Sequence, residues 1–257
     1  MPTRDVKWPV GTPCWVDAAV PEVDAATAFY GAVLGWTFHD TGEDYGHFQM
    51  CMAGEQTAAG IGKIQMEGQP AAWTVYLASD NADDTVKLIK DNGGTVFVEP
   101  MDIPQIGRMA IAADPTGAAF GVWQADPAPG ISIYNEPGGL VWEDARLSDP
   151  DAGRRFYTAV FGYEYTPIEG APDDYGTFAV GDGDPLGGMG GMMGAPEGTP
   201  SHWQPYFGVS DVDAAVAAAE SGGGTVIAPP MDTPYGRMAS LLDPFGAVFS
   251  VHCEIPA

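Results

Sequence analysis

The chain has few basic residues. Only 10 of its 257 residues are lysine or arginine, against 35 aspartate or glutamate, and the formal net charge is −25. Such a surface repels the phosphate backbone of nucleic acids and the head groups of anionic lipids. We therefore expect neither nucleic acid nor a membrane as a partner, whereas a cationic ligand would be attracted.

Cysteine and long hydrophobic runs are also scarce. The three cysteines, Cys14, Cys51 and Cys253, are odd in number and form no Cys-x-x-Cys pair, which argues against a disulfide framework or a zinc ribbon. No apolar run approaches the roughly 18–20 residues of a membrane span, and the first residues lack the apolar core of a signal peptide. These absences favour a cytoplasmic protein with reduced thiols.

What the sequence does contain is a long internal repeat. The segment 100–120 returns about 130 residues later as 230–249, with Pro-Met-Asp, Gly-Arg-Met-Ala, Asp-Pro and Gly-Ala in the same order. A solenoid repeat is only about 20–50 residues long, so this pattern predicts a duplicated domain. We expect one domain over 1–125 and a second over 139–257, joined by the Pro/Gly-rich linker 126–138, whose composition suits a hinge.

Each half contains the same order of elements twice. Apolar residues at helical spacing predict helices over 22–34, 82–90, 150–160 and 212–220. Short apolar segments bounded by turn residues predict one strand before each helix and three after it. The chain is therefore expected to be an α+β protein of four βαβββ modules.

Two duplicated motifs within this order are similar to those of a known family. Phe-Tyr followed by Leu-Gly-Trp occurs in 24–36, and Phe-Tyr followed by Phe-Gly-Tyr occurs in 151–163. Asp-Pro-x-Gly-Ala occurs at 114–118 and at 243–247. On these motifs the chain resembles the vicinal oxygen chelate superfamily, also called the glyoxalase/bleomycin-resistance/dioxygenase family, over nearly its whole length. The resemblance implies two tandem cup-shaped glyoxalase-like domains, but not a substrate, because the fold hosts lyases, isomerases, dioxygenases and drug-binding proteins.

The resemblance also implies where a divalent metal would bind. In enzymatic members His, Gln or Glu side chains hold the ion inside a cup of strands. The corresponding positions here are Trp15 and Trp142 on the opening strands, Trp73 and Trp203-Gln204 on the mid-domain strands, Gly121 and Ser250 on the closing strands, and 60–62 and 188–190 between them. An indole nitrogen only donates hydrogen bonds and cannot ligate a metal. We therefore expect no metal site and no cofactor in either half.

Other residues of the second half offer metal-binding groups close to these positions. They are Glu143, His202, Gln204 and His252. Glu143 is next to Trp142 on a strand, so the two side chains cannot both face the cup. The histidines fit ordinary edge or surface positions, and whether either one rebuilds a metal site stays open.

Tryptophan at matching places in both halves suggests cups lined with aromatic surface. The candidate ligand contacts are Trp15, Trp73, Trp142, Trp203, Met189, Gln204 and Ser250. A planar ligand stacked between indoles would gain about 0.5–1.5 kcal/mol per aromatic pair beyond its burial. The methionine would add an adaptable wall and the two polar residues would orient the ligand. Alternatively, the tryptophans simply fill the cups as core.

Arg108 and Arg237 occupy the same repeat position in a chain with few basic residues. Each follows a Met-Asp-x-Pro loop, so one interpretation is an ion pair with Asp102 or Asp232 that fixes a hairpin. The other places each guanidinium at a cup mouth, where it would bind a carboxylate or phenolate oxygen of a ligand.

The leading functional hypothesis is a metal-independent protein that binds or sequesters a hydrophobic aromatic small molecule, of the antibiotic-resistance or natural-product accessory type. A first alternative is an enzyme, either a glyoxalase-like lyase or a dioxygenase or hydroxylase with a non-standard metal site. A second alternative is an accessory interaction module for a biosynthetic enzyme. Because one chain carries four modules, it can complete both cups as a monomer or assemble further as a homodimer.

Overall fold

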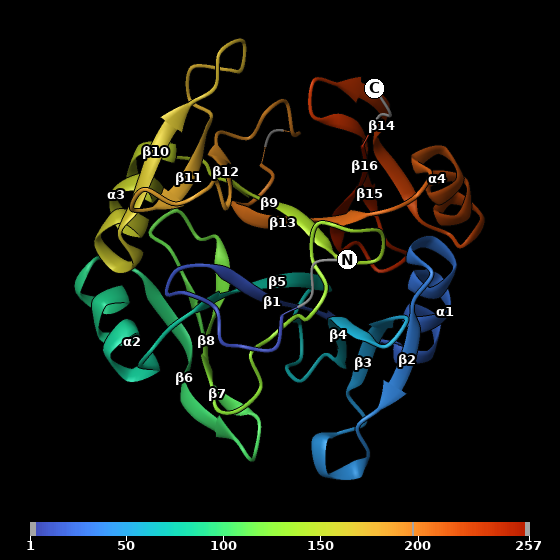
Figure 1. The fold of residues 1–257 in the computed structure, drawn as a ribbon, viewed down its shortest axis with the longest axis horizontal. Helices are drawn as coiled ribbons and strands as arrows, with labels where there is room; N and C mark the ends of the chain where they lie inside the picture. Colours follow the sequence, from blue (N-terminus) through green and yellow to red (C-terminus); the bar gives the residue numbers. More distant parts are fainter. Residues whose placement is uncertain (1–3, 197, 255–257) are drawn as a thin grey trace.

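The computed structural model describes residues 4–196 and 198–254, which form two β-sheets with four α-helices (Figure 1). The first half contains β1 (Pro13–Val20), α1 (Val23–Leu34), β2 (Thr37–Asp40), the short 3₁₀-helix η1 (Glu43–Tyr45), β3 (Gln49–Ala53), β4 (Gln56–Lys63), β5 (Ala72–Ala78), α2 (Ala82–Asp91), β6 (Thr95–Ile103), β7 (Gly107–Ala113) and β8 (Ala119–Ala125). The second half contains β9 (Leu140–Arg146), α3 (Pro150–Phe161), β10 (Tyr163–Pro167), β11 (Gly176–Val180), β12 (Gly187–Gly190), β13 (His202–Gly208), α4 (Val212–Ser221), β14 (Thr225–Thr233), β15 (Gly236–Leu242) and β16 (Val248–Cys253). This order confirms the four βαβββ modules and the α+β class.

Each half forms one eight-stranded sheet, and both sheets have the same topology. The strand orders are β2-β3-β4-β1-β5-β8-β7-β6 and β10-β11-β12-β9-β13-β16-β15-β14. The opening strands of paired modules lie antiparallel at the centre, β1 with β5 and β9 with β13. Each opening strand also pairs in parallel with the last strand of its own module. The duplication in sequence therefore gives two sheets whose positions can be matched residue by residue.

The helices begin and end at residues suited to those positions. Gly35 and Gly162 follow α1 and α3 with φ of 71° and 74°, a left-handed conformation that costs glycine little. At the starts of α2, α3 and α4, the side chains of Asn81, Asp149 and Asp211 accept hydrogen bonds from backbone N–H groups of the first turn. None of the helices in 4–196 and 198–254 is long and apolar enough to cross a membrane.

The two sheets share one hydrophobic core. In Figure 1 the two sheets meet near the centre of the molecule, where β5 contacts β13. The helices of the two halves also lie side by side there, α1 beside α4 and α2 beside α3. The Tyr30 hydroxyl on α1 donates a 2.9 Å hydrogen bond to Asp243 Oδ2 in the other half. Phe29 packs edge-on against Phe249. Buried residues of both halves thus belong to one continuous cluster.

The segment 126–138 between the halves is packed against both of them. Ile131 and Ile133 are each 1% exposed. Trp36 Nε1 donates a 2.7 Å hydrogen bond to the carbonyl of Gly138, and the amide of Ile131 donates to the carbonyl of Cys14 at 2.8 Å. The segment is held by these contacts, so the expected hinge is corrected to a fixed connection.

The remaining face of each sheet points away from the shared core. Along β1, Val16 and Ala18 are buried in the core, whereas Trp15 and Asp17 alternate with them and are only half-buried. We call these outward faces the first cup and the second cup. In Figure 1 the sheet of the first half lies in the lower part of the view and the sheet of the second half in the upper part. Their matched residues are Trp15, Asp17, Phe48, Gly60, Thr74, Tyr76, Ile111, Gly121 and Trp123 in the first cup, and Trp142, Asp144, Tyr175, Gly188, Gln204, Tyr206, Ser240, Ser250 and His252 in the second.

Candidate functional site

The strand pairing places one carboxylate at the same position in each cup. Asp17 on β1 lies opposite Gly60 on β4, and Asp144 on β9 lies opposite Gly188 on β12. Each aspartate follows two residues after a cup-facing tryptophan, so the two side chains share that tryptophan's face of the strand. Neither aspartate is among the residues that the sequence analysis selected.

In the second cup, Asp144 accepts four hydrogen bonds. Its Oδ1 accepts from Trp142 Nε1 at 3.1 Å and from the Tyr175 hydroxyl at 2.8 Å. Its Oδ2 accepts from the Tyr206 hydroxyl at 2.8 Å and from Arg146 Nη2 at 2.6 Å. Asp144 is 3% exposed. An ionised carboxylate offers about four lone-pair sites, so its accepting capacity is used within the protein.

The phenols around this carboxylate remain protonated. Burial is the main cause that raises the pKa of Tyr175 and of Tyr206, and the neighbouring charge of Asp144 raises both further. The charge of Asp144 in turn helps keep Arg146 ionised, since it raises the pKa of the guanidinium against the effect of burial. The second cup thus contains a network of neutral tyrosine hydroxyl groups and one ion pair around Asp144.

Gln204 and Ser250, both predicted as ligand contacts, lie together in the second cup. Gln204 Nε2 donates to Ser250 Oγ at 2.6 Å and to Ser240 Oγ at 3.1 Å. The two serine hydroxyls are 2.8 Å apart, and Ser250 is fully buried. These polar groups satisfy one another, as buried polar groups generally do.

In the first cup, Asp17 has fewer partners. Its Oδ2 accepts a 3.2 Å hydrogen bond from Trp15 Nε1. Burial raises the pKa of Asp17 to about 6, and hydrogen bonds from Tyr76 and Trp15 partly offset that rise. A carboxyl group with this pKa changes its charge near neutral pH, in the range useful for general acid–base chemistry and for reversible binding of a cation.

Two replacements explain why Asp17 is less well satisfied than Asp144. Ala19, paired with Gly62 on β4, stands where Arg146 stands in the second half. Phe48, whose ring lies over Gly60, stands where Tyr175 lies over Gly188. The first cup therefore lacks both the guanidinium and one hydroxyl of the second-cup network. No Lys, Arg or His of residues 4–196 and 198–254 forms an ion pair with Asp17.

The first cup is also the more apolar of the two. A second hydrophobic cluster lies there, distinct from the shared core, and contains Tyr76 and Trp123 packed by Trp15 and by side chains of β6 and β7. The other members are Cys14, Ala78, Trp8, Ile103, Ile106, Met109, Ile111, Ala125 and Ala128. Within the part of the chain that the structure describes, Trp8 Nε1 is buried with no hydrogen-bond partner.

The positions that the resemblance assigns to metal ligands do not fit an ion. The Tyr76 ring occupies the space that a side chain at Gly121 would need, and the Phe48 ring does the same at Gly60. In the second half the Tyr175 side chain covers Gly188. Over the described ranges, no three His, Cys, Asp or Glu side chains gather closely enough to hold a metal. At these positions aromatic rings replace the metal-binding side chains and fill the space that an ion would need.

Within the described residues, the histidines and the glutamate considered for rebuilding a metal site do not gather into a group that could hold an ion. A ring nitrogen of His202 is 2.8 Å from the carbonyl of Pro200, and one of His252 is 2.7 Å from the carbonyl of Tyr235. Glu143 faces the core side of β9, as strand alternation predicts, and burial there raises its pKa well above the usual range. A carboxyl held neutral in this way is a poor metal ligand.

Two of the four predicted tryptophans face the cups and two do not. Trp15 and Trp142 are cup-facing. Trp73 and Trp203 instead point to the core side of β5 and β13, where each indole donates to a helix tyrosine hydroxyl, at 2.9 and 2.8 Å. Met189 is likewise fully buried in the shared core. The expected placement of these three residues in the cups is corrected, because each lies one position out of phase with the cup-facing residues of its strand.

Arg108 and Arg237 form the predicted ion pairs. Arg108 lies 2.7 Å from Asp102 and 2.9 Å from Asp83 on α2. Arg237 makes the same pair of contacts, at 2.7 Å to Asp232 and at 2.8 Å to the first turn of α4. Both guanidinium groups therefore connect a hairpin to a helix start on the helix-covered face of the sheet, opposite the cup. The alternative placement at the cup mouths is wrong.

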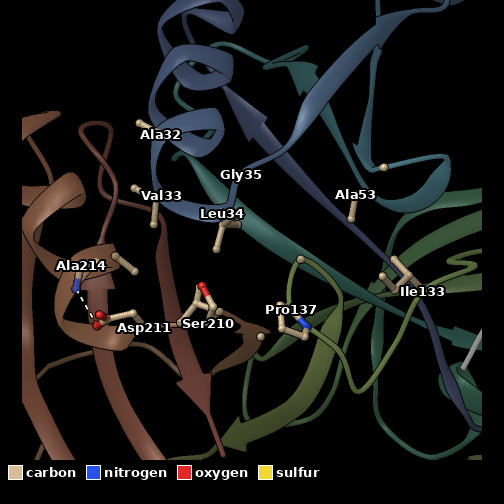
Figure 2. Close-up of a pocket in the computed structure, with 15 residues that line it drawn as sticks. Ala32, Val33, Leu34, Gly35, Ala53, Ile133, Pro137, Ser210, Asp211 and Ala214 are labelled. Atoms are coloured by element: carbon tan, nitrogen blue, oxygen red, sulfur yellow. Dashed lines mark hydrogen bonds between the residues drawn. The ribbon is translucent and has the colours of Figure 1, made fainter. Parts of the chain in front are cut away.

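A groove of about 480 Å³ lies between the halves rather than in a cup (Figure 2). Figure 2 shows the end of α1, the start of α4 and the connecting segment around it. Its lining is mostly small and apolar, including Ala53, Pro137 and Ala214. Asp211 is the charged residue in the lining, and its carboxylate already caps α4 through the amide of Ala214 at 3.0 Å. The groove is also lined by Ser210, and the capping carboxylate of Asp211 is the titratable side chain in its lining.

Comparisons with known proteins agree with this fold. The model of the Glyoxalase/Bleomycin resistance protein/Dioxygenase superfamily matches residues 14–122 and 139–251. "Putative glyoxylase CFP32" of Mycobacterium tuberculosis is 39% identical over 98% of this chain and 97% of its own length. "Anthracycline biosynthesis protein DnrV" of Streptomyces peucetius is 37% identical over 94% of this chain and 92% of its own length.

Solved structures show the same architecture at low sequence identity. The Mn(II)-bound glyoxalase from Novosphingobium aromaticivorans superposes with a TM-score of 0.67 at 18% identity, covering 96% of this chain and 83% of that one. The 2,3-dioxygenase LapB from Pseudomonas sp. KL28 has a TM-score of 0.62 at 14% identity, covering 95% and 92%. At these identities the likeness concerns the fold alone.

Proposed function

The chain belongs to the glyoxalase/bleomycin resistance protein/dioxygenase superfamily, and from this premise we propose that it binds a hydrophobic aromatic small molecule without a metal ion. One observation carries the proposal. The Tyr76 and Phe48 rings stand over Gly121 and Gly60, at positions that in metal-binding members supply ligands. A cup built in this way offers flat apolar surface where an enzyme of the family would offer a charged ion.

The exposed part of this surface suits a planar ligand. Trp15 is half-buried and keeps part of its indole accessible, beside Tyr76 and Trp123. Small-molecule sites generally combine such apolar walls with a few polar groups, and here Asp17 supplies one. Stacking on the indole adds about 0.5–1.5 kcal/mol per aromatic contact to the gain from burial.

The names of the relatives favour a natural-product ligand. A protein 37% identical over almost the whole chain carries the name of an anthracycline biosynthesis protein. We therefore take anthracyclines, which are planar aromatic compounds, as the first ligand class to test.

Titration with doxorubicin in the presence of EDTA tests the proposal. Binding is expected without added metal, and Trp15→Ala is expected to weaken it about tenfold or more because the ring stacks on the ligand. Trp142→Ala is the matched control in the second cup. Binding that requires Mn²⁺ or Zn²⁺, or that is unchanged in Trp15→Ala, would overturn the assignment.

A glyoxalase-like lyase is the second candidate, and Asp17 is the observation that favours it. A carboxyl with a pKa of about 6 in an apolar surround is suited to accept a proton from a carbon next to a carbonyl. Turnover of a 2-oxoaldehyde in the presence of a thiol, insensitive to chelators and lost in Asp17→Asn, would support this activity over simple binding.

A further inference from the structure

We propose that the first cup alone is the ligand site, and that Asp17 there binds a protonated amine of the ligand. This inference rests on the proposed aromatic-binding function and specifies the chemical class of its ligand.

The two matched carboxylates differ in how many hydrogen-bond and ion-pair partners the protein gives them. Asp144 accepts four hydrogen bonds, one from a guanidinium, and has no accepting capacity left for a ligand. Asp17 accepts a hydrogen bond from Trp15 Nε1, and no lysine, arginine or histidine in the described ranges forms an ion pair with it. In the second half, the matching carboxylate of Asp144 is paired with a cationic nitrogen of Arg146. In the first half such a nitrogen has to come from outside the protein.

The residues that surround the two carboxylates also differ between the cups. Strand pairing matches Ile111 with Ser240 and Gly121 with Ser250. Gln204 on β13 donates hydrogen bonds to both serines, and Thr74 occupies the matching position on β5. The second cup is thus filled by polar side chains bonded to one another, whereas the first cup presents an apolar cluster around one carboxylate. An apolar ligand body is therefore accommodated better in the first cup.

A carboxylate among aromatic rings favours a cationic ligand group. An ammonium group placed there gains an ion pair with Asp17 and an attraction to the electron-rich faces of nearby rings such as Trp15. It also removes the cost of holding the carboxylate in an apolar surround. An anionic ligand would instead meet Asp17 and a molecule of formal charge −25. A primary or methylated amine on an aromatic body satisfies all of these features.

A pair of probes that differ only in charge tests the inference. Doxorubicin carries one amine on a sugar attached to a planar aromatic body, and its N-acetyl derivative keeps the sugar and the body but loses the charge. We expect wild-type protein to bind the amine about tenfold to a hundredfold more tightly, as a charge-assisted hydrogen bond implies. In Asp17→Asn that difference between the two probes is expected to vanish while the N-acetyl compound still binds.

A second variant copies the second cup into the first. Ala19→Arg places a guanidinium where Arg146 stands beside Asp144, so it is expected to abolish the preference for the amine. Ala19→Met adds comparable bulk without charge and is expected to retain the preference. Circular dichroism melting of all variants verifies that each one folds.

The outcomes separate this inference from the proposed function. Equal binding of both probes by the wild type, or a preference that survives in Asp17→Asn and in Ala19→Arg, would overturn the role of Asp17 and leave aromatic binding intact. A preference lost in Asp144→Asn but kept in Asp17→Asn would place the site in the second cup and overturn the choice of cup. Failure of both probes to bind would overturn both proposals.

Discussion

Arg146 and Asp144 form an ion pair of 2.6 Å in the second cup, and Ala19 stands at the matching position beside Asp17 in the first. The two halves of the chain thus share a fold but differ in how one matched carboxylate is neutralised. A built-in guanidinium makes the second network complete. Its absence from the first cup leaves a carboxylate whose charge responds to pH and to a bound cation.

Stability should respond to Asp17 in a pH-dependent way. Burial raises the pKa of Asp17 to about 6 in the folded protein, so folding favours the protonated form. The resulting stabilisation is complete below the pKa of the unfolded chain and is lost as pH rises through about 6. At pH 7.5 ionised Asp17 then costs about 2–3 kcal/mol. Asp17→Asn is expected to be more stable than wild type by up to this amount at pH 7.5 and equally stable at pH 4, as measured by urea unfolding. A variant less stable than wild type at pH 7.5 would contradict the assigned environment.

In the second cup, a substitution beside the carboxylate should lower the stability of the protein. Arg146→Met leaves the buried charge of Asp144 without its cationic partner, and breaking a buried pair generally costs about 3–5 kcal/mol. We expect a loss of this order in the free energy of unfolding. The matched control is Ala19→Met, which places the same side chain in the first cup and breaks no pair. Equal stability of the two variants would show that the hydrogen-bond and ion-pair network of the second cup does not stabilise the fold.

Ligand affinity should also depend on pH. An amine binds Asp17 only in its ionised form, so affinity for doxorubicin is expected to fall as pH decreases through about 6. Between pH 5 and 7 the ligand amine stays protonated, which assigns the change to the protein. Calorimetric titrations at several pH values measure the dependence. Affinity in Asp17→Asn is expected to be flat over this range, and the same slope in that variant would assign the titration to another group.

The shared core predicts that the two halves unfold together. Tyr30 donates to Asp243 in the other half and accepts from Trp73 Nε1 at 2.9 Å. Tyr30→Phe leaves both groups buried without this partner and is expected to cost about 1–3 kcal/mol, with one cooperative thermal transition retained. Tyr235→Phe, at a side chain that is 65% exposed, is the control. Two separate transitions would contradict a common core.

Most of the fold could be predicted from the sequence because its signals are local and occur twice. The helix periodicity, the glycine stops at Gly35 and Gly162 and the duplicated motifs fix the module order. That the two halves share one core could not be predicted in the same way, since it depends on contacts such as Tyr30 with Asp243, which lie far apart in the chain.

The candidate site was predicted only in part. Trp15 and Trp142 face the cups, but Trp73 and Trp203 do not, because the position of the mid-domain strands was uncertain by one residue and such a shift reverses the face. The signal for the carboxylates was present as Trp-x-Asp at 15–17 and 142–144, since residues two apart share a face of a strand.

One correspondence between the halves was hidden by a difference in loop length. Asp-Tyr-Gly occurs at 44–46 and at 174–176, which suggests that Tyr45 matches Tyr175. The structure matches Phe48 with Tyr175 instead, because η1 adds a turn before β3. The missing hydroxyl beside Asp17 therefore became visible only once the strands were placed.

The most direct test of the account is the stoichiometry of doxorubicin binding to metal-free protein, measured by calorimetric titration in EDTA. A duplicated chain with two equivalent cups would bind two molecules per chain. The account predicts one molecule per chain, bound without metal, with an affinity about tenfold to a hundredfold lower in Ala19→Arg. Two molecules per chain, or binding that appears only after Mn²⁺ or Zn²⁺ is added, would contradict it.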